Sequence, residues 1–123
     1  MARRPGHGGR DVRYLFLLWG DEAGELALSD AERRAIVEAH GRFLRDVRDG
    51  GREVTGEPLG PSAEGVVVRG GGGSRTDGPF LETKEQIGGF YLIDCRDLDD
   101  AIELAGRIPA SPGLRVEIRS IPD

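Results

Sequence analysis

The stretch from Thr76 to Asp94, TDGPFLETKEQIGGFYLID, constrains the fold more than any other part of the chain. The residue before a proline is pushed away from helical geometry, and proline itself has a fixed φ and no N–H to donate, so the Gly78-Pro79 step predicts a tight turn. The stretch ends in an apolar segment whose side chains alternate between two faces, with Phe90 and Leu92 on one and Tyr91 and Ile93 on the other. We therefore expect a constrained turn, a charged segment and then a buried strand.

Length and charge narrow the class of protein. A chain of 123 residues predicts one domain with a core of its own. The formal net charge of −5 and the absence of a sustained basic face argue against a nucleic-acid binder. No apolar run approaches the roughly 20 residues that span a membrane, so we expect no membrane partner and a cytoplasmic location. Residues 1–10 read as a disordered basic tail, or alternatively as an arm for an acidic partner, before a single domain over 11–123.

The single cysteine limits the available chemistry. Cys95 excludes an internal disulfide and any cysteine-based metal framework, and it reads as a small buried group rather than a nucleophile. His40 is the only histidine outside the tail, so a histidine-rich metal site is also disfavoured. We expect no metal and no cofactor.

The remaining elements follow from periodicity and capping signals. Residues 12–19 form an almost continuous apolar run, typical of a central strand covered on both faces. Ser29 and Glu32 predict a capping box for a helix of about 20 residues that stops at Gly50-Gly51. Residues 52–59 and 64–69 read as a strand pair, and the glycines of 70–73 as a flexible hairpin tip. A second helix, which Asp97 caps and Pro109 stops, and a half-buried strand over 114–120 complete the chain.

This order predicts a ferredoxin-like α+β fold, an antiparallel sheet with two helices on one face. Such a sheet leaves its other face uncovered, while the first strand is apolar on both sides. The sequence therefore predicts a partner over that face, most simply a second copy of the chain, which would enclose a cavity between two sheets.

The central stretch also carries a family resemblance. The run Asp77-Gly78-Pro79-Phe80, followed by Glu82-Thr83-Lys84-Glu85-Gln86 and by Gly88 to Asp94, closely resembles the DGPF subgroup of the YCII-related family. Residues 13–15 with 20–22 resemble that family's opening, and residues 56–59 its second strand. The resemblance covers residues 12 to about 121, and it departs at the tetraglycine loop and at Ser120, where a proline is more usual.

The resemblance implies a ferredoxin-like fold that pairs into a dimeric α+β barrel. It also implies a wider superfamily that includes muconolactone isomerases and a dehydrochlorinase, and hence acid–base chemistry on small organic molecules. Subgroup members are often encoded beside extracytoplasmic-function sigma factors. Related proteins carry a proposed histidine–aspartate pair with the histidine on the first helix, which is where His40 falls.

Two residues are the catalytic candidates. The constrained turn can hold the Asp77 carboxylate in one orientation, as a general acid or base requires, although the same carboxylate could simply bond the turn's backbone. His40 has an unperturbed pKa suited to proton transfer, although a lone histidine on an apolar helix face is more often a boundary residue.

Five residues are the candidates for substrate binding. Lys84 and Glu85 follow the turn and could bind an anionic group or form a solvated loop. Arg13, Trp19 and Tyr91 lie on predicted strands, where they could face the cavity and suit a carboxylated or aromatic ligand, or serve packing alone.

We therefore weigh two functions. The first is cofactor-free isomerase- or lyase-like chemistry on a small molecule in a homodimer cavity, with Asp77 and His40 as the acid–base pair. The alternative is a non-catalytic regulatory or interaction module linked to an extracytoplasmic-function sigma factor.

Overall fold

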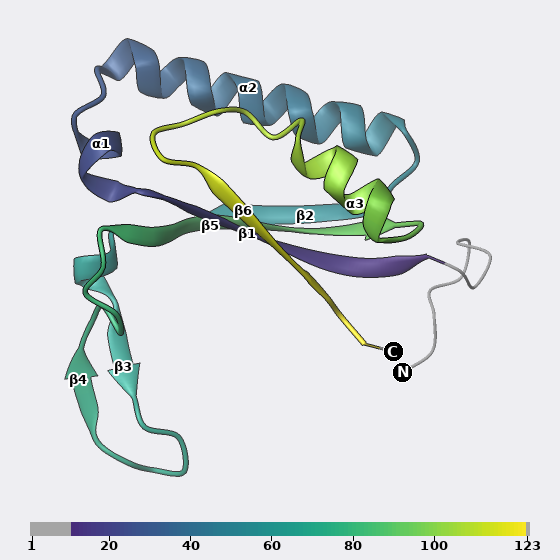
Figure 1. The fold of residues 1–123 in the computed structure, drawn as a ribbon. Coiled ribbons are helices and arrows are strands. Elements are labelled where there is room, and N and C mark those ends of the chain that lie inside the picture. Colours follow the sequence, from purple (N-terminus) through teal and green to yellow (C-terminus); the bar gives the residue numbers. More distant parts are fainter. Residues whose placement is uncertain (1–10, 123) are drawn as a thin grey trace.

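The computed structural model of the protein describes residues 11–122, so the predicted tail over residues 1–10 lies outside the described residues. Figure 1 shows two helices above a twisted sheet and a small hairpin that projects from one end of it. The elements, in chain order, are β1 (Val12–Asp21), α1 (Glu22–Leu26), α2 (Asp30–Asp49), β2 (Val54–Pro58), the 3-10 turn η1 (Ser62–Glu64), β3 (Val66–Val68), β4 (Arg75–Asp77), β5 (Glu85–Cys95), α3 (Leu98–Ala105) and β6 (Arg115–Ser120).

The main sheet has four antiparallel strands in the order β2-β5-β1-β6. The two long strands, β1 and β5, lie side by side at the centre, with Leu15 opposite Leu92 and Leu17 opposite Phe90. A register shift between Leu18 and Trp19 marks a local irregularity in this pairing. The predicted α+β class with an antiparallel sheet is therefore confirmed. The strand predicted over residues 12–19 and the strand predicted at the end of the Thr76–Asp94 stretch form the centre of the sheet.

One face of this sheet forms the core. The side chains of Tyr14 and Phe16 on β1 and of Tyr91, Ile93 and Cys95 on β5 are buried. They belong to one cluster with buried residues of α2 and of the α3 region: Phe43, Val47, Ala101, Leu104 and Ile108. The intervening strand residues, which include Leu15, Leu17, Phe90 and Leu92, are only partly buried in a single chain. We call these four together with Trp19 the open face.

The predicted caps of the two longer helices are confirmed. Ser29 and Glu32 bond each other's backbone N–H groups in a capping box, and Gly50 ends α2 as its C-cap. Asp97 caps α3 through the N–H of Asp100. Along α3, Ala101 and Leu104 are buried, whereas Leu98 and Ile102 are about half exposed. The short helix α1, which Asp21 caps, was not predicted.

The strands predicted within residues 52–59 and 64–69 are present as β2 and β3, but their predicted pairing with each other is wrong. β2 instead pairs with β5 in the main sheet, whereas β3 pairs with β4, a strand that the sequence analysis did not identify. The tetraglycine run lies at the tip of the β3–β4 hairpin, as expected, and Gly71 and Gly72 have positive φ values that favour glycine. The sequence did not predict the β3–β4 pairing, because each strand has only three residues and so shows no clear alternation of side chains.

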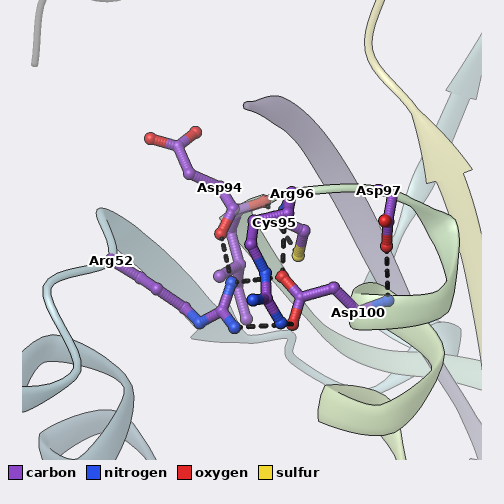
Figure 2. A network of polar contacts seen from close by, with 7 residues as sticks. Arg52, Asp94, Cys95, Arg96, Asp97 and Asp100 are labelled. Carbon is purple, nitrogen blue, oxygen red and sulfur yellow. Dashed lines mark hydrogen bonds and ion pairs between the residues drawn. The ribbon is translucent and has the colours of Figure 1, made fainter. Parts of the chain in front are cut away.

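An arginine clamp ties the start of β2 to the start of α3 (Figure 2). Nη1 and Nη2 of Arg52 donate to the two carboxylate oxygens of Asp100, each at 2.7 Å, and Nη1 also donates to the backbone oxygen of Asp94. The backbone N–H and the guanidinium of Arg96 add two further bonds to Asp100. The clamp therefore satisfies a carboxylate that is 7 % exposed and fixes α3 against the end of β5.

Candidate functional site

A histidine–tyrosine pair lies between α2 and the sheet. His40 comes from the middle of α2 and Tyr91 from the centre of β5, and Nδ1 of the histidine is 2.6 Å from the phenol oxygen of the tyrosine. The two rings are also stacked, with centroids 5.9 Å apart. The helix presents His40 toward the sheet because it shares a face with Phe43 and Val47, which are buried. Two titratable side chains that are 51 residues apart in the chain thus form one hydrogen-bonded unit.

Burial shifts both groups toward their neutral forms. His40 is partly buried, and this desolvation lowers the pKa of its imidazole. Tyr91 is 5 % exposed, and desolvation raises the pKa of its phenol. Near neutral pH the pair therefore consists of a neutral imidazole and a neutral phenol. With the imidazole proton on Nδ1, that nitrogen donates to the phenol oxygen and Nε2 keeps a lone pair that can accept a proton.

The backbone packs closely around Tyr91. Gly56 on β2 lies opposite Tyr91 on β5, and a Cβ atom at this glycine would overlap both the tyrosine ring and the backbone oxygen of Phe90. On the helix side, the ring of Phe43 lies 5.2 Å from the ring of Tyr91, in a tilted arrangement. The phenol is thus held from two sides, which fixes the position of its hydrogen bond to His40.

A hollow of about 270 Å³ lies on the surface beside Phe43, where α2 faces the loop after α3. Its walls combine apolar groups with two guanidinium groups and one carboxylate: Ala39, Arg42, Phe43, Asp46, Val47, Arg107 and Pro109. His40 and Tyr91 do not line it. Phe43 is the residue that the hollow and the histidine–tyrosine pair share.

Asp77, the first catalytic candidate, is the last residue of β4, where it is exposed and opposite Val66. Within residues 11–122, its carboxylate makes no hydrogen bond or ion pair. Figure 1 shows the β3–β4 hairpin below the sheet and α2 above it, so one chain does not bring Asp77 to His40. Proton exchange between these two residues would therefore require Asp77 from a second copy.

Lys84 and Glu85 are both exposed at the start of β5. Glu85 lies opposite Asp21 at the same end of the sheet, where Glu25 of α1 also lies near Gly20 and Gly88. Burial and the charges of Glu22 and Asp21 raise the pKa of Glu25. This end of the sheet thus gathers several carboxylates, although the described residues contain no group of three or more potential metal ligands.

Arg13 and Trp19 are on β1 and alternate with the buried side chains of that strand. The indole N–H of Trp19 donates to a carboxylate oxygen of Glu117 on β6 at 3.0 Å. Tyr91 points instead into the core under α2. The predicted binding residues are therefore distributed over three places in one chain: the open face, the helix side and the β4–β5 loop.

Sequence reasoning missed two contacts. Tyr91 was predicted either to face a ligand or to serve packing alone, and the structure places it in the core, but its bond to His40 was not predicted. Glu22 accepts bonds from both the backbone N–H and the hydroxyl of Ser62, which lower the pKa of the Glu22 carboxyl and tie α1 to η1. No local sequence signal connects residues 40 positions apart, so this second contact had to come from the structure.

Comparisons with known proteins identify the family of this chain. The model of the YCII-related domain matches residues 12–121, and the chain belongs to this family. The chain is also similar to an uncharacterised protein from Rhizobium meliloti (strain 1021), with 35 % identity over 94 residues, which cover 75 % of this chain and 76 % of the relative. Among the described residues, no helix is long and apolar enough to cross a membrane.

Proposed function

We propose that this YCII-related protein binds a small anionic or aromatic molecule as a homodimer and catalyses cofactor-free proton transfer, as an isomerase or lyase does. The observation that carries the proposal is the 2.6 Å bond between His40 and Tyr91. A general base near neutrality needs a neutral imidazole in a fixed orientation, and both conditions are met on α2. In this proposal His40 moves the proton, and Tyr91 is the positioning residue that holds its ring.

The dimer in this proposal is a ferredoxin-like dimeric α+β barrel, formed when two open faces meet. Support comes from the partly exposed apolar row at the centre of β1 and β5, which a monomer would leave facing water. Arg13 and Trp19 would then face the inter-sheet cavity. Asp77 and Lys84 would lie at the subunit boundary on that side of the sheet, as an acid–base group and an anion-binding group for the cavity, separate from His40 on the helix side.

The test starts with the ionisation of His40. We expect NMR titration to give a His40 imidazole pKa below about 6.5, the value of an unperturbed histidine. The chain has a second histidine, His7, whose NMR signal is identified by its loss in a His7→Gln variant. Because the folded pKa is lowered, the neutral ring favours the folded state. The resulting stability is complete above the unfolded pKa and decreases as the pH falls below it.

A ligand screen then tests the chemistry. Small carboxylates and lactones would be incubated with the protein in D₂O, with proton exchange at the carbon next to the carbonyl as the readout. We expect His40→Gln to abolish exchange and Tyr91→Phe to lower its rate about fivefold with an altered pH profile, since loss of one positioning bond costs about 1 kcal/mol. Exchange that persists in His40→Gln would refute the role of His40.

The second candidate function is an interaction module for an extracytoplasmic-function sigma factor. The same histidine–tyrosine bond fits this function, because two polar side chains in a purely structural core also pair with each other. In the described part of the chain, no buried polar side-chain atom lacks a partner. Binding of the host's purified sigma factors across a salt series, unaffected by His40→Gln, would support this function over catalysis.

A further inference from the structure

The β3–β4 hairpin is an arm that the rest of the chain leaves uncovered. We define the hairpin arm as residues 65–78. Its two strands pair only with each other, in a separate two-stranded sheet, and each has three residues. An isolated two-stranded hairpin of this size is marginally stable in water. Such a short hairpin gains stability from a surface that it can pack against.

The arm exposes apolar side chains that such a surface would cover. Val66 and Val68 are 50 % and 60 % exposed, and they share one face of β3 because they are two residues apart. Directly after the arm, Phe80 is 80 % exposed. A large aromatic ring and β-branched residues gathered on one projecting segment are typical of an interaction surface rather than of scattered surface residues.

The base of the arm is fixed, so its direction is defined. The N–H of Gly78 donates to the oxygen of Gly65 at 2.7 Å, and a Cβ atom at Gly78 would come within 2.9 Å of that same backbone. Just before the arm, both the backbone N–H and the hydroxyl of Ser62 bond Glu22 on α1. These contacts anchor the arm to the end of the main sheet.

The direction of the arm selects its partner. Figure 1 shows the arm on the side of the sheet away from α2 and α3, which is the side of the open face. A molecule covering the open face would therefore lie next to the arm. The tip is cationic, with Arg69 and Arg75 on either side of the tetraglycine turn, whereas the chain as a whole carries a net charge of −5. A second copy of this chain offers an apolar face, its own open face, with the carboxylate of Glu117 beside Trp19.

We propose that the hairpin arm clasps a second copy of the chain, with Val66, Val68 and Phe80 packed on the partner. The contact is reciprocal, because in a two-fold dimer each arm reaches the other copy in the same way. This inference rests on the homodimer of the proposed function and adds to it a separate contact.

The test measures dimer dissociation by analytical ultracentrifugation. We expect the double change Val66→Ser and Val68→Ser to raise the dimer Kd by about a hundredfold, because four valines lose their buried surface in each dimer. The matched control is Val37→Ser on α2, which removes the same side chain from a site that is 70 % exposed on the helix side, and which should leave the Kd unchanged. Circular dichroism checks that both variants keep the fold.

The contact itself can be mapped with a photo-crosslinker. Val68→Cys provides an exposed thiol for labelling, whereas the native Cys95 is buried and its raised pKa keeps it unreactive. Mixed dimers of ¹⁴N and ¹⁵N chains distinguish links between copies from links within one chain. We expect links between copies, to peptides of β1, β2 or β5.

Each outcome has a separate meaning. A dimer whose Kd does not respond to the arm valines, or crosslinks confined to one chain, would overturn the arm contact and leave the dimer intact. A monomer at all concentrations would overturn both the arm contact and the dimer. The role of His40 is tested separately by proton exchange, so failure of the chemistry would leave the arm contact standing.

Discussion

Arg52 and Asp100 face each other as a two-point ion pair, with both nitrogen–oxygen distances at 2.7 Å. The side chain of Asp100 is 6 % exposed and that of Arg52 is 22 % exposed. This geometry holds the pKa of the Asp100 carboxyl well below its usual range, through the hydrogen bond from Arg52 and then those from Arg96. The pair joins segments 48 residues apart and is the main polar link between the α2–β2 connection and α3.

Replacing Asp100 by Asn should destabilise the protein by about 3 kcal/mol, because it leaves the Arg52 guanidinium without its counter-charge in a partly buried place. Urea unfolding followed by circular dichroism gives the free energy of unfolding. Asp99→Asn is the matched control, since it removes a carboxylate from the exposed side of the same first turn and should cost less than about 1 kcal/mol. Equal effects of the two variants would show that the ion pair contributes nothing beyond the helix dipole.

The same pair predicts how stability depends on acid. Asp100 has a lowered pKa in the folded state, so its contribution is complete above the unfolded pKa of about 3.9 and is lost as the pH falls toward the folded value. The difference in unfolding free energy between the natural protein and Asp100→Asn should therefore shrink between about pH 5 and pH 2. A difference that stays constant over this interval would mean that the Asp100 pKa is not lowered by folding.

Cys95 should be inert in the folded protein. Its side chain is fully buried at the end of β5, and desolvation raises the pKa of the thiol to about 12. Because the thiolate is the reactive form, a chromogenic disulfide reagent at pH 8 should react only at the rate of unfolding. Reaction should become complete in urea. Rapid stoichiometric reaction of the native protein would show that the end of β5 opens far more readily than its packing indicates.

The sequence predicted those features that depend on local chemistry. The capping box of α2 and the alternation along β5 are encoded in neighbouring residues, so their prediction succeeded. The partner of β2 was missed because it depends on a strand more than 25 residues later, and the three-residue strands of the arm give too short a pattern for periodicity to detect.

The candidate site shows the same division. The sequence predicted that His40 lies on the apolar face of its helix, because His40 is three and seven residues before Phe43 and Val47. Its hydrogen-bond partner was not, because Tyr91 reaches it only once β5 has taken the centre of the sheet. Asp77 lies on the hairpin arm, where no contact with a described residue orients its carboxylate. The separation of Asp77 from His40 depends on the tertiary fold, so the sequence could not predict it.

Gly56→Ala tests whether the position of Tyr91 matters to His40. A methyl group at Gly56 would overlap the tyrosine ring, so β2 and the ring must move apart, and we expect a loss of about 2 kcal/mol in the free energy of unfolding. The ring cannot move without disturbing the phenol oxygen, so the NMR signals of the His40 imidazole should shift as well. Gly60→Ala is the matched control, because a Cβ atom there meets nothing within 4 Å and the backbone φ is not positive. If Gly56→Ala lowers stability while the His40 signals stay in place, the two side chains are not held together by the packing of β2, and the positioning role proposed for Tyr91 fails.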